Sequence, residues 1–108
     1  MKIKTFVLLA ALSTGFANTA FAQADAGKDA LYVKSLAATC ANCHGTNGKA
    51  VEGSSVVSIA GLDRAYMVAQ MKAFKNGTRP ATIMHQLSKG YSDAQIETLA
   101  TYFAAQKK

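Results

Sequence analysis

The amino-acid sequence predicts an all-α protein, built of helices and turns with little strand. Apolar residues recur at helical spacing in three separate stretches of the chain. Residues that favour helix N-termini stand before two of these stretches. The elements are taken below in chain order.

The first 22 residues have the features of a secretory signal peptide. Lys2 and Lys4 precede an apolar run over residues 6–16, and residues 20–22 read Ala-Phe-Ala. The run is shorter than the roughly 20 apolar residues that cross a bilayer. No cysteine stands at the cut to accept a lipid anchor. We expect cleavage after Ala22 and export of residues 23–108 to the periplasm as one domain without a membrane anchor.

Removal of residues 1–22 from the chain of 108 leaves 86 residues. At that size the apolar core is thin, and a disulfide, metal or cofactor usually adds stability. The formal charge falls from +6 to +4 with the loss of Lys2 and Lys4, and the remaining basic residues are scattered. They form no cluster interleaved with aromatic residues, so we expect no nucleic-acid partner.

The first helix is predicted over Asp29–Thr39, where Val33, Leu36 and Ala37 recur at helical spacing. A cysteine motif begins as this helix ends. Residues 45–61 then change to glycine, serine and small side chains, which predicts a long surface loop. Such a loop is unusual in a compact domain unless it wraps around another group.

Two further helices follow the loop. Asp63 is a good N-cap for the second helix, and Gly77 stands just beyond its end. Residues 78–90 form a partly helical connection. Ser92 and Gln95 then form a capping box for the last helix. The residues predicted to face inward are Met67, Met71 and Phe74 in the second helix, and Ile96, Leu99 and Phe103 in the last.

The chain has only two cysteines, Cys40 and Cys43, and His44 follows the second directly. A thioredoxin-like redox pair needs a βαβ context, which the pattern lacks. A structural zinc site normally needs four protein ligands, and beyond this motif only His85 remains. A disulfide accounts for the cysteines but not for the histidine.

Covalent haem attachment accounts for all three residues. Cysteines three positions apart on a helix lie about one turn apart, so both thiols can reach the two haem vinyl groups from the same side. The imidazole that follows can then ligate the iron. In an exported chain Cys-x-x-Cys-His is specific for this chemistry. We predict one covalently bound haem c, held through Cys40 and Cys43 and ligated by His44, and the porphyrin supplies the missing core.

The sixth iron ligand decides between an electron carrier and a gas-binding or catalytic haem. A thioether opposite His44 fills the coordination of the iron and raises its potential. Met84 lies in the turn-rich connection and is the preferred ligand, because Met67 and Met71 lie on a helical stripe that favours a core role. His85 is the alternative, since imidazole also suits iron.

The segments CANCHGTNG and SIAGLDRAYMVAQMKAFKNGTRPATIMHQLSKGYSDAQIETLATYFAAQ resemble small bacterial class I cytochromes c over nearly all of residues 23–108. More narrowly, RPATIMHQLSKGYSDAQI is similar to the cytochrome subunits of flavocytochrome c sulfide dehydrogenases and their single-domain relatives. The resemblance implies a class I cytochrome c fold. Three to five helices would wrap around the covalently attached haem, with the first and last helices packed together.

The resemblance also implies roles for individual residues. Cys40 and Cys43 would form the thioethers, and His44 and Met84 would be the axial iron ligands. A backbone carbonyl of the long loop would accept a hydrogen bond from the other ring nitrogen of His44. Relatives often have a proline in this loop where the chain reads VSIAG over residues 57–61, and a carbonyl near Val57 is the candidate.

These observations predict a periplasmic electron-transfer protein, not an enzyme, whose iron cycles between Fe(II) and Fe(III). The alternative is the electron-accepting cytochrome subunit of a sulfide or sulfite dehydrogenase. There a flavoprotein or molybdoprotein chain would carry out the substrate chemistry, because this chain lacks a Gly-rich dinucleotide fingerprint. A terminal oxidase is a further candidate redox partner. A haem sensor or peroxidase with open iron is a third class, and it requires that Met84 does not ligate.

Overall fold

The computed structural model describes the backbone of residues 17–108 and the side chains of residues 26–108. The chain divides into two units, Met1–Leu31 and Tyr32–Lys108, and each is described by itself. Most of the predicted signal peptide, residues 1–16, lies outside the described residues. Within the described part of the first unit the chain is helical. No helix among the described residues is both long enough and apolar enough to span a membrane.

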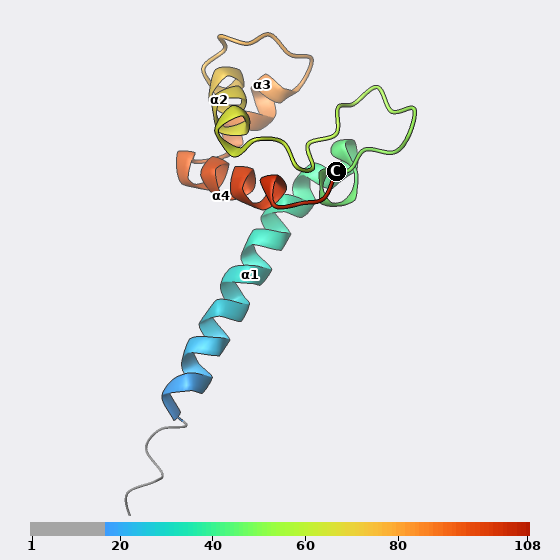
Figure 1. The fold of residues 1–108 in the computed structure, drawn as a ribbon. Helices are drawn as coiled ribbons and strands as arrows, with labels where there is room; N and C mark the ends of the chain where they lie inside the picture. The colour runs from blue at the N-terminus through green and yellow to red at the C-terminus, as the bar shows by residue number, and fades with distance from the viewer. Residues whose placement is uncertain (1–16) are drawn as a thin grey trace, which may run out of the picture. The chain divides into compact units, whose positions relative to one another are not determined.

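The second unit is built from helices (Figure 1). Along the described chain the elements are α1 (Ala17–His44), the 3-10 turn η1 (Thr46–Gly48), α2 (Arg64–Lys75), α3 (Met84–Leu87), the 3-10 turn η2 (Ser88–Gly90) and α4 (Asp93–Ala104). Residues 17–108 contain no strand, so the all-α prediction is confirmed.

Helix α1 is longer than the predicted Asp29–Thr39 and contains the whole cysteine motif. The prediction ended it too early, because none of the residues 40–44 breaks a helix. The first residue that does is Gly45, with a φ of 80°. Its N–H still donates to Ala41 O at 2.9 Å. The cysteine motif therefore forms the last turn of α1.

The predicted start and end of α2 and the predicted start of α4 are confirmed. The Asp63 carboxylate accepts a hydrogen bond from Tyr66 N at 2.8 Å and caps α2. Gly77, with a φ of 76°, follows the last turn of that helix. Both hydrogen bonds of the capping box between Ser92 and Gln95 are present at the start of α4.

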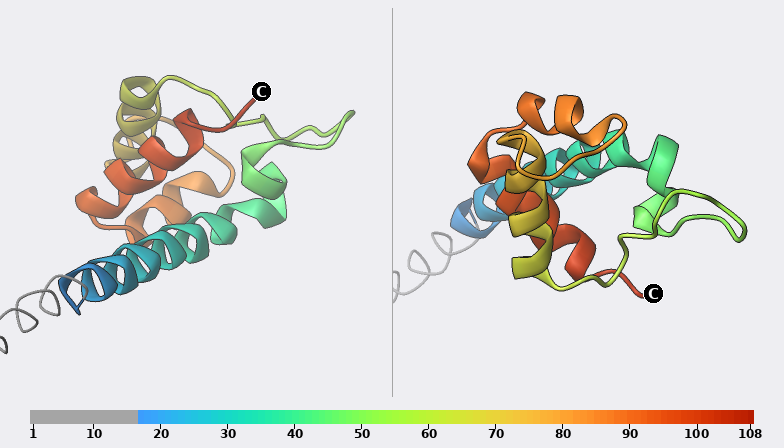
Figure 2. Two further views of the ribbon diagram at one scale, coloured as in Figure 1. Left: turned by 60° about the horizontal axis from the view of Figure 1, so that its bottom comes forward. Right: turned by 90° about the horizontal axis from the view of Figure 1, so that it is seen from above.

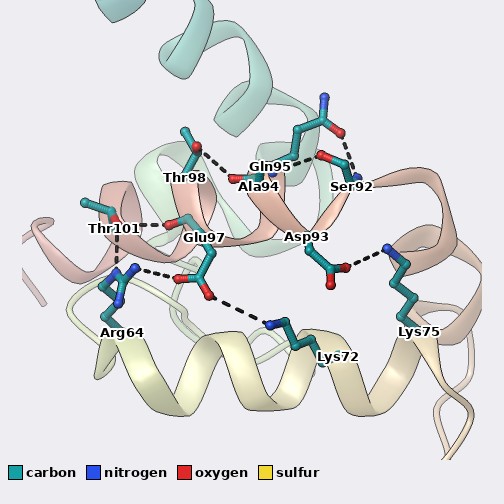
Figure 3. A network of polar contacts seen from close by, with 10 residues as sticks. All are labelled: Arg64, Lys72, Lys75, Ser92, Asp93, Ala94, Gln95, Glu97, Thr98 and Thr101. Carbon is teal, nitrogen blue, oxygen red and sulfur yellow. Dashed lines mark hydrogen bonds and ion pairs between the residues drawn. The ribbon is translucent and has the colours of Figure 1, made fainter.

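Helices α2 and α4 pack against each other (Figure 2). Polar side chains line one side of this contact (Figure 3). Glu97 of α4 accepts from Arg64, and Lys72 lies 3.9 Å from its carboxylate. Lys75 Nζ donates to Asp93 Oδ1 at 2.9 Å. This hydrogen bond and the charge of Lys75 hold the pKa of Asp93 below its usual value.

The apolar core of the second unit is small. Its buried cluster consists of Ala37, Met67, Leu99, Ala100 and Phe103. The predicted inward face of the last helix is confirmed, because Ile96, Leu99 and Phe103 are all buried. Ala37 brings the second half of α1 into this core, next to residues of α4. The long loop contributes little to it, since Val51 and Val57 are 75% and 66% exposed.

Candidate functional site

Cys40, Cys43 and His44 occupy the last turn of α1. Cys40 and Cys43 form no disulfide with each other; Cys40 is half-buried and Cys43 is exposed. Burial raises the pKa of the Cys40 thiol above its usual value. The helix places the two sulfurs about one turn apart, as attachment to two vinyl groups requires.

The imidazole of His44 is oriented by the long loop. His44 Nδ1 lies 2.7 Å from Val57 O. A carbonyl oxygen only accepts hydrogen bonds, so Nδ1 carries the proton and donates it. Nε2 then keeps its lone pair, which is the arrangement in which an imidazole ligates a metal through Nε2. The structure thus assigns to Val57 the carbonyl that the sequence located only approximately.

Gly48 holds the loop that carries Val57. Its carbonyl oxygen accepts hydrogen bonds from Ile59 N at 2.8 Å, Ala60 N at 3.0 Å and Ser58 Oγ at 2.9 Å. Gly48 has a φ of +78°, and a Cβ added there would lie 2.7 Å from Ile59 Cγ1. Only glycine therefore allows this close approach of η1 to the loop.

The methionines differ in what their sulfur atoms contact. Met67 is buried in the core cluster. Met71 Sδ lies 3.7 Å from the hydroxyl of the fully buried Ser88, which donates to it. Met84 is half-buried at the start of α3, and no hydrogen bond engages its sulfur in the described part of the chain. The core role predicted for Met67 is confirmed. The sulfur of Met71 accepts the hydrogen bond from Ser88.

His85 has an unsatisfied nitrogen. Its Nδ1 atom is buried and has no hydrogen-bond partner among the described residues. Leaving a buried polar atom unpaired costs roughly 1 to 3 kcal/mol. A group from outside the polypeptide, placed beside α3, would offer it a partner. No pattern in the sequence indicates that this nitrogen is buried.

Two open hollows lie elsewhere on the second unit. Each has a volume of about 460 Å³ and is bordered by Tyr102 and Gln106, with residues of α1 and α4 around them. None of Cys40, Cys43, His44 and Met84 lines either hollow. The hollows therefore do not mark the candidate site.

The chemistry of the last turn of α1, with Cys40, Cys43 and His44, fits haem c. Two thiols one turn apart can form two thioethers, and the imidazole beside them presents Nε2 for ligation. The buried nitrogen of His85 adds an unsatisfied polar atom on α3. An all-α fold with this turn defines a c-type haem protein.

Comparison with known proteins identifies the family. The chain belongs to the cytochrome c family, whose pattern matches residues 24–107. It is 38% identical to the cytochrome subunit of sulfide dehydrogenase from Chlorobaculum tepidum over 89% of this chain and 87% of that protein. It is 34% identical to cytochrome c4 from Pseudomonas aeruginosa, over 78% of this chain but only 41% of the relative.

A solved structure supports the same fold. Cytochrome c4 from Acidithiobacillus ferrooxidans matches with a TM-score of 0.57 and 33% identity, over 61% of this chain and 37% of that one. The class I cytochrome c fold is therefore confirmed. The protein carries covalently attached haem c, and its function is electron transfer rather than catalysis of a substrate reaction.

Proposed function

We propose that Cys40 and Cys43 hold the haem as thioethers and that His44 and Met84 are its axial iron ligands. The hydrogen bond from His44 Nδ1 to Val57 O, at 2.7 Å, carries this proposal because it orients the imidazole for ligation. When bound, the haem supplies an iron that gains and loses one electron. The chain supplies a nitrogen and a thioether sulfur to that iron, and this pair raises its reduction potential.

The contacts of the methionines support Met84 as the sulfur ligand. Met67 lies in the core, and Met71 Sδ accepts from Ser88, so neither sulfur is available without repacking. His85 is the second candidate, because its Nδ1 is buried without a partner in the described chain. Neighbouring residues on a helix point roughly 100° apart, so Met84 and His85 cannot both approach the iron from one direction.

The ligand assignment is tested by single substitutions. The ferric protein should show the weak near-infrared band of a thioether bound to iron, and the ferrous protein should not bind carbon monoxide readily. Met84→Ala should abolish the band, open the iron to carbon monoxide and lower the reduction potential. His85→Ala is the matched control and should keep the band. If His85→Ala changes the iron ligation and Met84→Ala does not, His44 and His85 are the two axial ligands. Ready binding of carbon monoxide by the unaltered protein would favour the sensor or peroxidase class.

We further propose that the carrier works in the periplasm after cleavage between Ala22 and Gln23. The basic start, short apolar run and Ala-Phe-Ala ending of residues 1–22 support this location. Mass spectrometry of the protein from its native cells should find an N-terminus at Gln23 and a mass increased by one haem. A mass that retains residues 1–22 would contradict the cleavage.

The redox partner that we propose is a dehydrogenase of sulfur compounds. Support comes from the relatives, which include the cytochrome subunit of sulfide dehydrogenase and, at 35% identity, the thiosulfate dehydrogenase electron acceptor of Thiomonas intermedia. The chain spans 87% of the first protein but only 33% of the second. A free carrier should purify alone from the periplasm, whereas a subunit should purify with a flavoprotein or molybdoprotein chain.

Electron delivery can be measured directly in periplasmic extracts. Sulfide, sulfite or thiosulfate should reduce the haem of this protein in an extract from its own cells. An extract from cells that lack the protein should oxidise the same compound more slowly. Equal rates with and without the protein would argue for another electron donor.

A further inference from the structure

Tyr91 is held at four points between η2 and α4. Its ring packs against the core cluster. Its N–H donates to Ser88 O at 3.3 Å, and its carbonyl accepts from Lys75 Nζ at 2.8 Å. Its hydroxyl lies 2.7 Å from Thr39 Oγ1. The residue is therefore fixed in position by both its main chain and its side chain.

The direction of the hydroxyl contact follows from the other bond of Thr39. The Thr39 hydroxyl has a single proton, which it donates to Leu36 O at 2.7 Å. It can therefore only accept from Tyr91, whose O–H is the donor. The bond joins positions 52 residues apart in the sequence.

This bond links the two parts of the chain that supply the proposed iron ligands. Thr39 directly precedes Cys40 on the helix that ends in His44. Tyr91 ends the segment of α3 and η2 that begins with Met84. Among the hydrogen bonds between described side chains, the one between Tyr91 and Thr39 joins this segment to α1.

We propose that Tyr91 is a positioning residue for the sixth ligand. It holds the segment of Met84 against the motif helix and so limits how often Met84 leaves the iron. This inference rests on the proposed ligation. For Met84 to leave, α3 must move relative to the turn of His44, and the tyrosine bond resists this movement. Without the hydroxyl the ring still packs, but the segment is tied to α1 less firmly.

The experiment measures the rate at which imidazole binds to the ferric, haem-loaded protein, because an added ligand enters when Met84 leaves. Tyr91→Phe removes one hydroxyl and should raise this rate about five- to tenfold, the change expected for one hydrogen bond. Thr39→Val should raise it to the same extent, and the double variant should add nothing further. Thr39→Ser keeps a hydroxyl and should behave like the unaltered protein.

Tyr102→Phe is the matched control. Tyr102 OH also makes a 2.7 Å hydrogen bond, to Asn47 Oδ1, and joins α4 to η1 without touching the Met84 segment. The Tyr102→Phe substitution should lower the denaturant midpoint about as much as Tyr91→Phe does. It should leave the rate of imidazole binding unchanged. An unchanged rate in Tyr91→Phe, or an equal rise in Tyr102→Phe, would overturn the proposal.

Failure of the ligand assignment gives a different result. If Met84→Ala keeps the near-infrared band, or the unaltered protein lacks it, Met84 is not the ligand. If His85 is the ligand instead, it lies in the same segment, and the imidazole rate in Tyr91→Phe still reports whether Tyr91 restrains that segment. The two proposals are thus tested by separate readouts.

Discussion

At the scale of single residues, Gly48 connects His44 to the rest of the fold. Its carbonyl oxygen accepts three hydrogen bonds from residues 58–60. The neighbouring Val57 accepts from His44 Nδ1. The orientation of the imidazole therefore depends on a glycine outside the motif, through the loop that Gly48 anchors.

Replacing Gly48 with alanine tests this dependence. The new Cβ would lie 2.7 Å from Ile59 Cγ1 and 2.8 Å from Phe103 Cδ1, so the loop must move. We expect overpacking to lower the unfolding free energy by roughly 1 to 3 kcal/mol. Backbone strain at the positive φ adds a further loss of roughly 1 to 2 kcal/mol. The reduction potential should change as Val57 O shifts. Denaturant unfolding and redox titration of the haem-loaded protein measure both effects.

Gly53→Ala is the control for backbone strain. Gly53 has the same φ of +78°, but no atom lies within 4 Å of its added Cβ. The substitution should therefore produce the strain alone and leave the potential unchanged. Equal effects of the two variants on stability and potential would show that the contact at Gly48 does not matter to His44.

Sequence patterns predict the residues whose roles depend on spacing along one helix. Cys40, Cys43 and His44 are identified in this way, because one turn of helix brings them together. The contact between Thr39 and Tyr91 is not predictable, because it joins positions 52 residues apart and neither residue belongs to a motif. The burial of His85 Nδ1 cannot be predicted from the sequence pattern either, because burial depends on tertiary packing.

At the scale of helices, α4 starts from a complete capping box (Figure 3). Ser92 Oγ accepts from Gln95 N at 3.1 Å, and Gln95 Oε1 accepts from Ser92 N at 2.9 Å. Ser92→Ala removes the first bond and should lower the unfolding free energy by about 1 kcal/mol. Chemical denaturation of the haem-loaded protein would show this as a lower midpoint.

Thr98→Ala provides the comparison within the same helix. The Thr98 hydroxyl donates to Ala94 O at 2.9 Å, inside the helix rather than at its end. That carbonyl also lies in the helical ladder, and alanine favours helix more than threonine does. The midpoint should hardly change. A loss equal to that of Ser92→Ala would mean that capping is not the reason for the effect.

The ends of α2 and α4 were predictable because capping is a local property of neighbouring residues. Asp63, Gly77 and Ser92 each identify a helix end without knowledge of the tertiary fold. The apolar pattern predicts an end of α1 at Thr39, whereas the helix continues to His44 through the cysteine motif. Its residues accept helical geometry, and Gly45 is the first that ends it.

At the scale of the whole molecule, few side chains form the core. The buried cluster holds five residues, two of which are alanine. Haem-free protein, made in cells without haem attachment, should therefore lack cooperative unfolding, because cofactor binding contributes directly to folding stability. Circular dichroism during denaturation should show a broad, shallow transition, against a sharp one for the haem-loaded form. A sharp transition in the haem-free protein would show that the polypeptide core suffices.

Three tyrosine hydroxyls tie the region around the motif to the last third of the chain. The pairs are Tyr91 with Thr39, Tyr102 with Asn47, and Tyr32 with Gln95, separated by 52, 55 and 63 positions. A chain is synthesised from its N-terminus, so these hydrogen bonds cannot form until nearly the whole sequence has been synthesised. Closing such long loops also costs entropy that a single helix does not lose. The turn with Cys40 and Cys43 consequently stays uncovered until late in folding, an interval in which both thiols are open to reaction.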